Sequence, residues 1–218
     1  ADADEDLSLT LADTVINAAE DATVGITLTG IDPGNTVEIS LAHDSDVGED
    51  GPVDGANVVT AVYDSGDQWV ADVTGLTDGQ IHVHAEVTDP AGNVASVQGS
   101  FHLDATAPSD LSGLVVQNDN GVEDDDDLTN ETALTTPDGE GVDQGGQAGT
   151  SPTTYYALSN EGAGTTGWIT EPTDLVFDGT GQTGTSNTVY YKQIDAAGNE
   201  SNVSSYTFTY DDTDPSVS

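Results

Sequence analysis

Two short motifs recur in this chain at nearly the same spacing, and this repeat constrains the fold more than any other feature. Asp89-Pro-Ala-Gly-Asn93 returns as Asp195-Ala-Ala-Gly-Asn199, and Asp104-Ala-Thr-Ala-Pro108 returns as Asp211-Asp-Thr-Asp-Pro215. The two pairs keep the same order and are offset by 106 and 107 residues. A period of about 100 residues is the size of an immunoglobulin-type β-sandwich. The repeat therefore predicts two tandem domains.

Residues 81–88 alternate between apolar and polar side chains, which is the pattern of a half-buried β-strand. A five-residue turn, Asp89–Asn93, separates them from another apolar run. The first repeat contains seven such runs: Leu7–Leu11, Val24–Thr29, Val37–Leu41, Val58–Tyr63, Trp69–Val73, Ile81–Val87 and Val94–Leu103. Helix signals are nearly absent, so we predict an all-β fold of antiparallel strands.

The second repeat is looser. Its expected strands are Leu111–Gln117, Thr132–Thr136, Thr154–Ser159, Gly167–Thr170, Leu175–Phe177, Thr188–Ile194 and Ser205–Tyr210. A Gly-rich loop at residues 137–152 has no counterpart in the first repeat, and the acidic run Glu123–Asp127 is expected to replace Asn17–Glu20. We predict two immunoglobulin-like antiparallel β-sandwich domains, residues 1–104 and 105–218, joined by a short stiff linker.

The net charge of the chain excludes several classes of binding partner. Asp and Glu total 41 against a single Lys or Arg, giving a formal net charge of −40. The electric field of such a chain repels phosphate groups, so we expect no binding to nucleic acid and no direct contact with a membrane. Copies of the chain also repel one another, and we expect a monomer. Self-repulsion requires counter-ions, which high salt or bound divalent cations supply. A marine or halophilic source fits this balance.

Cysteine and methionine are both absent. Without disulfides, an extracellular chain needs another brace, and Ca²⁺ is the usual one. Without Met, we expect a segment of a larger protein. No Gly-x-Ser-x-Gly elbow, phosphate loop or His-bearing zinc motif occurs, so we predict that the chain is not an enzyme.

The two repeat endings, "TDPAGN…F.LDATAP" and "IDAAGN…FTYDDTDP", resemble the bacterial Ig-like repeats of large repeats-in-toxin (RTX) adhesins and biofilm-associated surface proteins. "VINAAE", "IDPGNTVEISL" and "NDNGVEDDDDLTN" are similar to that family as well. The resemblance covers nearly all of residues 7–104 and mainly residues 188–215 of the second repeat. It implies an extracellular extender on a bacterial cell surface, whose partners are neighbouring Ig-like domains of the same chain and whose junctions are stiffened by Ca²⁺.

Seven-stranded sandwiches bring particular loops to each end, and the acidic residues of those loops predict three Ca²⁺ sites. The interdomain site gathers Asn17, Glu20, Asp21, Asp78, Asp104, Asp110, Asp195 and Asn199. An N-terminal half-site gathers Asp2, Asp4, Glu5, Asp89 and Asn93, and a C-terminal half-site gathers Glu123, Asp124, Asp125, Asp126, Asp127, Asp211, Asp212 and Asp214. The alternative for these acids is a solvated surface charge, and Asp89/Asn93 and Asp195/Asn199 also suit turn capping.

The sequence is also compatible with other functions. The second domain is a candidate glycan- or protein-binding module, through Trp168 or Tyr155, and the pair is also compatible with an accessory region of a polysaccharide-degrading enzyme. His82, His84 and His102 share one predicted sheet face and are a weaker zinc candidate. Trp69 and Trp168 are expected in the cores.

Overall fold

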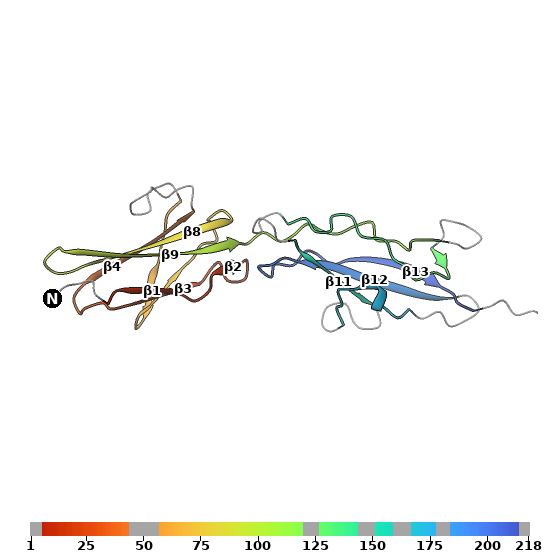
Figure 1. Cartoon of the computed structure of the whole chain (residues 1–218), viewed down its shortest axis with the longest axis horizontal. Helices are drawn as coiled ribbons and strands as arrows, with labels where there is room; N and C mark the ends of the chain where they lie inside the picture. Colours follow the sequence, from red (N-terminus) through yellow and green to blue (C-terminus); the bar gives the residue numbers. More distant parts are fainter. Residues whose placement is uncertain are drawn as a thin grey trace, which may run out of the picture. The chain divides into compact units, whose positions relative to one another are not determined.

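The computed structural model describes residues 6–43, 57–119, 127–143, 151–158, 167–177 and 184–213. Within these ranges the chain is all-β, and its one helical element is a short 3-10 turn, η3 (Pro172–Asp174). No helix in the described part is long and apolar enough to cross a membrane. The described residues fall into two compact units, one running to Thr106 and the other starting at Ala107 (Figure 1).

The first unit is a sandwich of two sheets. One sheet has the order β1 (Ser8–Leu11), β3 (Val24–Thr29), β7 (Gln68–Ala71) and β6 (Val62–Ser65). The other has the order β2 (Val15–Asn17), β9 (Val94–Asp104), β8 (Gly79–Thr88), β4 (Thr36–His43) and β5 (Val59–Thr60). In chain order this is the immunoglobulin arrangement, in which the first strand divides between the two sheets and the last strands pair centrally.

The core of the first unit lies between the two sheets. Ile26 and Leu28 of β3 face Ile39 and Leu41 of β4, and all four are at most 1% exposed. Trp69 is 7% exposed, so the expectation of a core position is confirmed for this tryptophan. Alternate residues of each strand point outward, because successive side chains leave a strand on opposite faces.

The predicted hairpin after residue 88 is confirmed. β8 and β9 pair antiparallel from Thr88↔Val94 to Gly79↔Leu103, which leaves Asp89–Asn93 as the five-residue turn. The sequence reading missed β2, a three-residue strand that pairs parallel with the end of β9. This strand is too short to show a period, and its position depends on β9.

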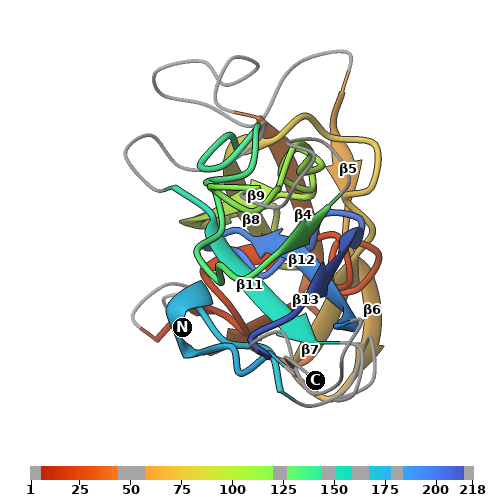
Figure 2. The same cartoon turned by 90° about the vertical axis from the view of Figure 1, so that its right-hand side faces the viewer.

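The second unit has one regular sheet, with the order β10 (Leu128–Thr129), β13 (Ser204–Tyr210), β12 (Thr185–Ile194) and β11 (Thr153–Leu158). Figure 2 shows β11, β12 and β13 as neighbours. The opposite layer is formed by extended segments joined through single bridges, Ser112↔Asp138 and Val116↔Leu134. Leu111, Leu114 and Val116 of this layer pack against the sheet in one buried cluster with Tyr191 and Phe208.

Four predicted strands of the second unit were wrong as regular strands. Residues 111–117 and 132–136 make only the bridges just named, and residues 167–170 make one bridge, Tyr156↔Ile169. Residues 175–177 follow η3 and join no ladder. Gly113, at a φ of 70°, supplies one reason, since a left-handed residue interrupts an extended strand.

Of the run Glu123–Asp127, which was expected to replace Asn17–Glu20, only Asp127 belongs to the described residues, and it does not take the place of Asn17. The parallel ladder pairs Asn17 with Asp104 in the first unit and Thr129 with Tyr210 in the second. The amide of His102 donates to the carbonyl of Thr14, and that of Thr209 donates to the carbonyl of Asp127. Asp127 therefore occupies the place of Thr14, and the counterpart of Asn17, opposite Asp211, is Asn130.

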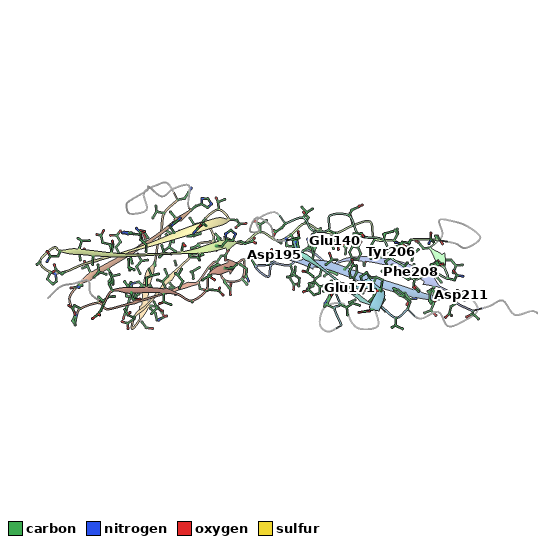
Figure 3. All side chains as sticks on the ribbon, viewed as in Figure 1. Glu140, Glu171, Asp195, Tyr206, Phe208 and Asp211 are labelled. Carbon is green, nitrogen blue, oxygen red and sulfur yellow. The ribbon has the colours of Figure 1, made fainter. Side chains whose placement is uncertain are left out.

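In each unit the chain enters at one end and leaves at the other. In the first, Gly30 lies against the Asp6 backbone and Gly34 lies near Pro90 of the β8–β9 turn, whereas β9 carries the chain away from that turn to Asp104. In the second, the Ser109 carbonyl accepts a hydrogen bond from Gln193 beside the β12–β13 turn. Asp195 of that turn and Asp211 lie at opposite ends of the unit (Figure 3).

Candidate metal-binding site

The C-terminal end of the first unit carries a buried carboxylate. Asp104 ends β9, is 2% exposed and faces Asn17 across the parallel ladder. Asp78, which precedes β8, accepts a hydrogen bond from the Ala105 amide at 2.9 Å and another from the Thr106 hydroxyl. Asp78 thus holds the departing chain in place, and its two oxygens are engaged by that chain.

The predicted ligands Asn17, Glu20 and Asp21 lie in one tight turn beside Asp104. The Asn17 side-chain oxygen accepts from the Ala19 amide at 2.8 Å, and a Glu20 oxygen accepts from the Asn17 amide at 3.3 Å. The Asp21 carbonyl accepts from the Val73 amide at 2.7 Å. These bonds fix the turn, and they leave lone pairs on the same side-chain oxygens, because a carboxylate or amide oxygen accepts more than one bond.

The N-terminal end of the second unit is formed by a capped turn. The Asp195 Oδ1 accepts from the amides of Gly198 and Asn199 at 2.7 and 2.8 Å, and its Oδ2 accepts from the Asn199 side chain at 2.9 Å. Asp195 is 8% exposed and Asn199 is 7% exposed. The turn-capping role that the sequence allowed is therefore present, and it leaves both residues buried at the end of the unit.

Asp143 lies close to Asp195 at this end of the unit and was not among the ligands predicted from the sequence. Each of the two residues offers a carboxylate oxygen within 4.8 Å of the other, and Asp143 is half-buried. Asp143 lies in the Gly-rich loop, whose path no local pattern predicts. Its sequence signal was only an isolated acid among glycines, so nothing set it apart from the other acids of the chain.

Gln193 explains how this loop reaches Asp195. Its side chain is fully buried and donates to the carbonyls of Ser109 at 2.6 Å and Gly139 at 3.1 Å, while it accepts from the Gly141 amide at 3.2 Å. The Ser109 amide in turn donates to the Val142 carbonyl at 3.1 Å. One amide side chain therefore ties the first residues of the unit to the segment that ends at Asp143.

Asp110, which the sequence predicted as a ligand of the interdomain site, is hydrogen-bonded to Asn202. Both of its oxygens accept from Asn202, one from the backbone amide and one from the side chain, each at 2.9 Å. The side-chain bond, followed by the backbone bond, lowers the pKa of Asp110. Asp110 therefore closes the N-terminal segment of the unit onto the start of β13.

The chain's one Lys or Arg side chain contacts Glu200 and Trp168. That residue, Lys192, lies 2.6 Å from Glu200 and 5.0 Å above the centre of the Trp168 ring. It is 9% exposed, and both of these contacts hold it on β12. Trp168 is only half-buried beneath it, so the prediction of a core position was wrong for this residue.

Several predicted half-site residues lie outside the described part of the chain: Asp2, Asp4, Glu5, Glu123, Asp124, Asp125, Asp126 and Asp214. Of the others, Asp89 caps its turn through Asn93 at 2.7 Å, and this side-chain bond chiefly lowers its pKa. Asp127 accepts from the Tyr206 hydroxyl at 2.6 Å, and Asp211 accepts from the Thr213 amide at 2.9 Å. Asp212, next to Asp211, is also described.

The imidazoles do not form a metal cluster in the residues that the structure covers. His82, His84 and His102 occupy neighbouring strands, with His82 opposite Ser100 and His102 opposite Gln80. The group of acidic and histidine residues that comes close enough to share an ion contains aspartates and no histidine. The zinc alternative is therefore not supported by these positions.

The donor chemistry at the end of the second unit fits a hard cation. Carboxylate oxygens such as those of Asp143 and Asp195 are ligands that Ca²⁺ takes in proteins, and Ca²⁺ needs six to eight oxygens in total. Two carboxylates this close repel each other more strongly where burial lowers the local dielectric constant. A bound divalent ion would offset that repulsion.

No protein-family model and no curated protein sequence matches this chain. Among solved structures, it is similar to fibronectin(III)-like modules of Clostridium thermocellum CbhA, at 12% identity over 94% of both chains with a TM-score of 0.43. It is also similar to a Ca²⁺-stabilized, ice-binding adhesin of an Antarctic bacterium, at 20% identity over 94% of this chain and 48% of that one with a TM-score of 0.41.

A further similar structure is a tetra-tandem repeat from the extending region of a large adhesion protein. Its identity is 22%, its TM-score is 0.31, and the match covers 94% of this chain and 49% of that one. This chain thus spans about half the length of the two adhesin structures.

Proposed function

We propose that this chain is a Ca²⁺-dependent spacer segment of a secreted bacterial surface adhesin, and that it is not an enzyme. The observation that carries the proposal is the Asp143–Asp195 pair, which lies at the end of the second unit where the chain arrives. Each residue offers a carboxylate oxygen within 4.8 Å of the other, and the chain's one Lys or Arg side chain pairs with Glu200. A cation at this point would act on the connection between the units.

Asp104 is the ligand that the first unit contributes in this proposal. It is buried at the last residue of β9, two residues before the unit ends at Thr106. Asp78 fixes the intervening residues, Ala105 and Thr106, so that the direction of the departing chain is set. An ion held by Asp104 together with Asp143 and Asp195 would restrict rotation about the linker.

The path of the chain supports the role of a spacer. Each unit is entered at one end and left at the other, as a segment that carries the chain onward requires. The net charge of −40 suits an exterior with dissolved divalent ions and disfavours anionic partners. Adhesion itself is assigned to other parts of the parent protein.

Small-angle X-ray scattering tests the proposal. We expect chelation of Ca²⁺ by EDTA to make the chain more flexible and to broaden its distance distribution. Asp143→Asn should show the chelated behaviour even with Ca²⁺ present, whereas Asp174→Asn, at an exposed position on η3, should behave as the wild type. Identical scattering with Ca²⁺ and with EDTA would contradict a stiffening role for the ion.

A further inference from the structure

A concave surface on the first unit is lined by aromatic and polar side chains. It encloses about 440 Å³ between the turn that joins β3 to β4 and the hairpin that joins β6 to β7. Its lining includes Tyr63, Trp69, Asp32, Asn35 and Asp67. This volume lies within the range of roughly 300–1,000 Å³ that is typical of small-molecule sites.

Tyr63 is the unusual member of this lining. It is paired directly with Trp69 across β6 and β7, so both side chains leave the sheet on the same face. Trp69 is buried in the core at 7% exposure, but Tyr63 is 59% exposed. The two rings meet edge to face, with centroids 5.6 Å apart and planes at 72°. Despite this contact, more than half of the Tyr63 surface remains open to solvent.

The polar groups are held by two fixed turns. The Asn35 amide donates to the Asp32 carbonyl at 3.2 Å, and Gly34 of that turn has a φ of 100°. The Asp67 carbonyl accepts from the Leu28 amide at 3.0 Å, and the preceding Gly66 has a φ of 60°. These constraints keep both turns in place before a ligand arrives, which lowers the entropic cost of binding.

We propose that this surface is a binding site for a neutral saccharide. A sugar ring presents an apolar C–H face, which suits the open face of Tyr63, and hydroxyls that both donate and accept hydrogen bonds. Asn35 offers both functions, and Asp32 and Asp67 offer strong acceptors. The two carboxylates and the charge of −40 disfavour acidic sugars. A purely cationic ligand would use the acceptors and leave the donors of Asn35 without a role.

This site lies on the first unit, whereas the sequence pointed to Trp168 and Tyr155 of the second. Trp168 is covered by Lys192, whose ammonium lies 5.0 Å from its ring centre. The proposal does not depend on Ca²⁺ or on the spacer role, since every residue that carries it belongs to the first unit.

Saturation-transfer NMR of the full chain tests it, with cellotetraose, maltotetraose and mannotetraose as neutral probes. Choline chloride serves as the cationic probe and 3′-sialyllactose as the acidic one. We expect at least one neutral tetrasaccharide to bind. Tyr63→Ala should weaken that binding about tenfold or more, a loss of about 1.4 kcal/mol, and Tyr63→Phe should largely preserve it.

Val62→Ala is the matched control, since Val62 is the adjacent residue on β6, is 66% exposed and does not line the surface. Asp67→Asn gives a second, independent loss if Tyr63→Ala disturbs folding. The proposal is overturned if no neutral saccharide binds at about 10 mM, well above a millimolar dissociation constant. It is also overturned if binding survives both substitutions, or if choline alone binds in a manner that requires Tyr63.

Discussion

Asp143 and Asp195 bring carboxylate oxygens to within 4.8 Å of each other across 52 residues of sequence, at the end of the second unit where the chain enters. At this separation two unit charges repel by about 3.5 kcal/mol at an effective dielectric constant of about 20. The chain's one basic side chain is engaged elsewhere, with Glu200. The pair therefore has a physical reason to bind a divalent cation, and the predictions below begin with it.

Removal of Ca²⁺ should lower the melting temperature of the second unit. A site with a Kd of about 10⁻⁴ M in about 10 mM Ca²⁺ contributes about 2.7 kcal/mol by mass action. For a domain of this size, that free energy corresponds to a shift of roughly 10–20 °C in differential scanning calorimetry. Asp143→Asn should remove most of the shift and Asp174→Asn should retain it. A transition that is insensitive to EDTA would exclude this site.

Gln193→Leu should destabilise the second unit strongly. The substitution leaves the carbonyls of Ser109 and Gly139 and the amide of Gly141 buried without their partner, at a cost of about 3 kcal/mol or more. Urea denaturation measures the loss. Gln68→Ala is the control, because Gln68 makes one exposed side-chain bond, to Thr27, and should cost no more than about 0.5 kcal/mol.

The same Gln193 variant should weaken Ca²⁺ binding, since it releases the segment that carries Asp143. Isothermal titration below the melting temperature of the variant separates this effect from global unfolding. Unchanged affinity in a destabilised variant would mean that Asp143 is positioned by something other than Gln193.

Lys192→Met should cost about 0.5–2 kcal/mol, because it removes the cation–π contact with Trp168 and the contact with Glu200. The loss stays moderate because the Glu200 side chain is 54% exposed and can be hydrated. In a Trp69→Phe background the emission of Trp168 should change on this substitution, and Lys192→Arg should largely preserve the wild-type spectrum. Identical emission from Lys192→Met would show that the contact is absent in solution.

Acid should destabilise the second unit partly through Asp110. Its pKa is lowered in the folded state, chiefly by the Asn202 side chain. The stability that Asp110 contributes is therefore present above its unfolded pKa of about 3.8. It is lost as the pH falls through the lower pKa of the folded state. Free energies of unfolding measured from about pH 5 to about pH 2 should fall less steeply for Asp110→Asn than for the wild type.

Asn202→Ala should also make the free energy of unfolding depend less steeply on pH, since it removes the side-chain donor that lowers the pKa of Asp110. Parallel profiles for the wild type and both variants would contradict the assignment of the shift to this contact.

Local patterns in the sequence were enough to predict much of the fold. The alternation in residues 81–88 predicted β8, and the Asp and Asn residues at both ends of Asp89–Asn93 predicted a tight turn, which the structure contains. Such features depend on neighbours within a few residues, because alternation and turn capping are short-range effects. The same reasoning failed for residues 111–117, where packing across the core substitutes for a regular ladder.

The sequence by itself determined an all-β chain with a repeat of about 107 residues, two capped turns and an excess of carboxylates without basic partners. Only the tertiary structure decided which carboxylates meet. Asp143 reaches Asp195 because Gln193 holds a Gly-rich loop, and Asn130 occupies the place of Asn17 because β10 pairs with β13. Glycine-rich segments have little conformational preference of their own, so their paths depend on distant hydrogen bonds that sequence patterns do not encode.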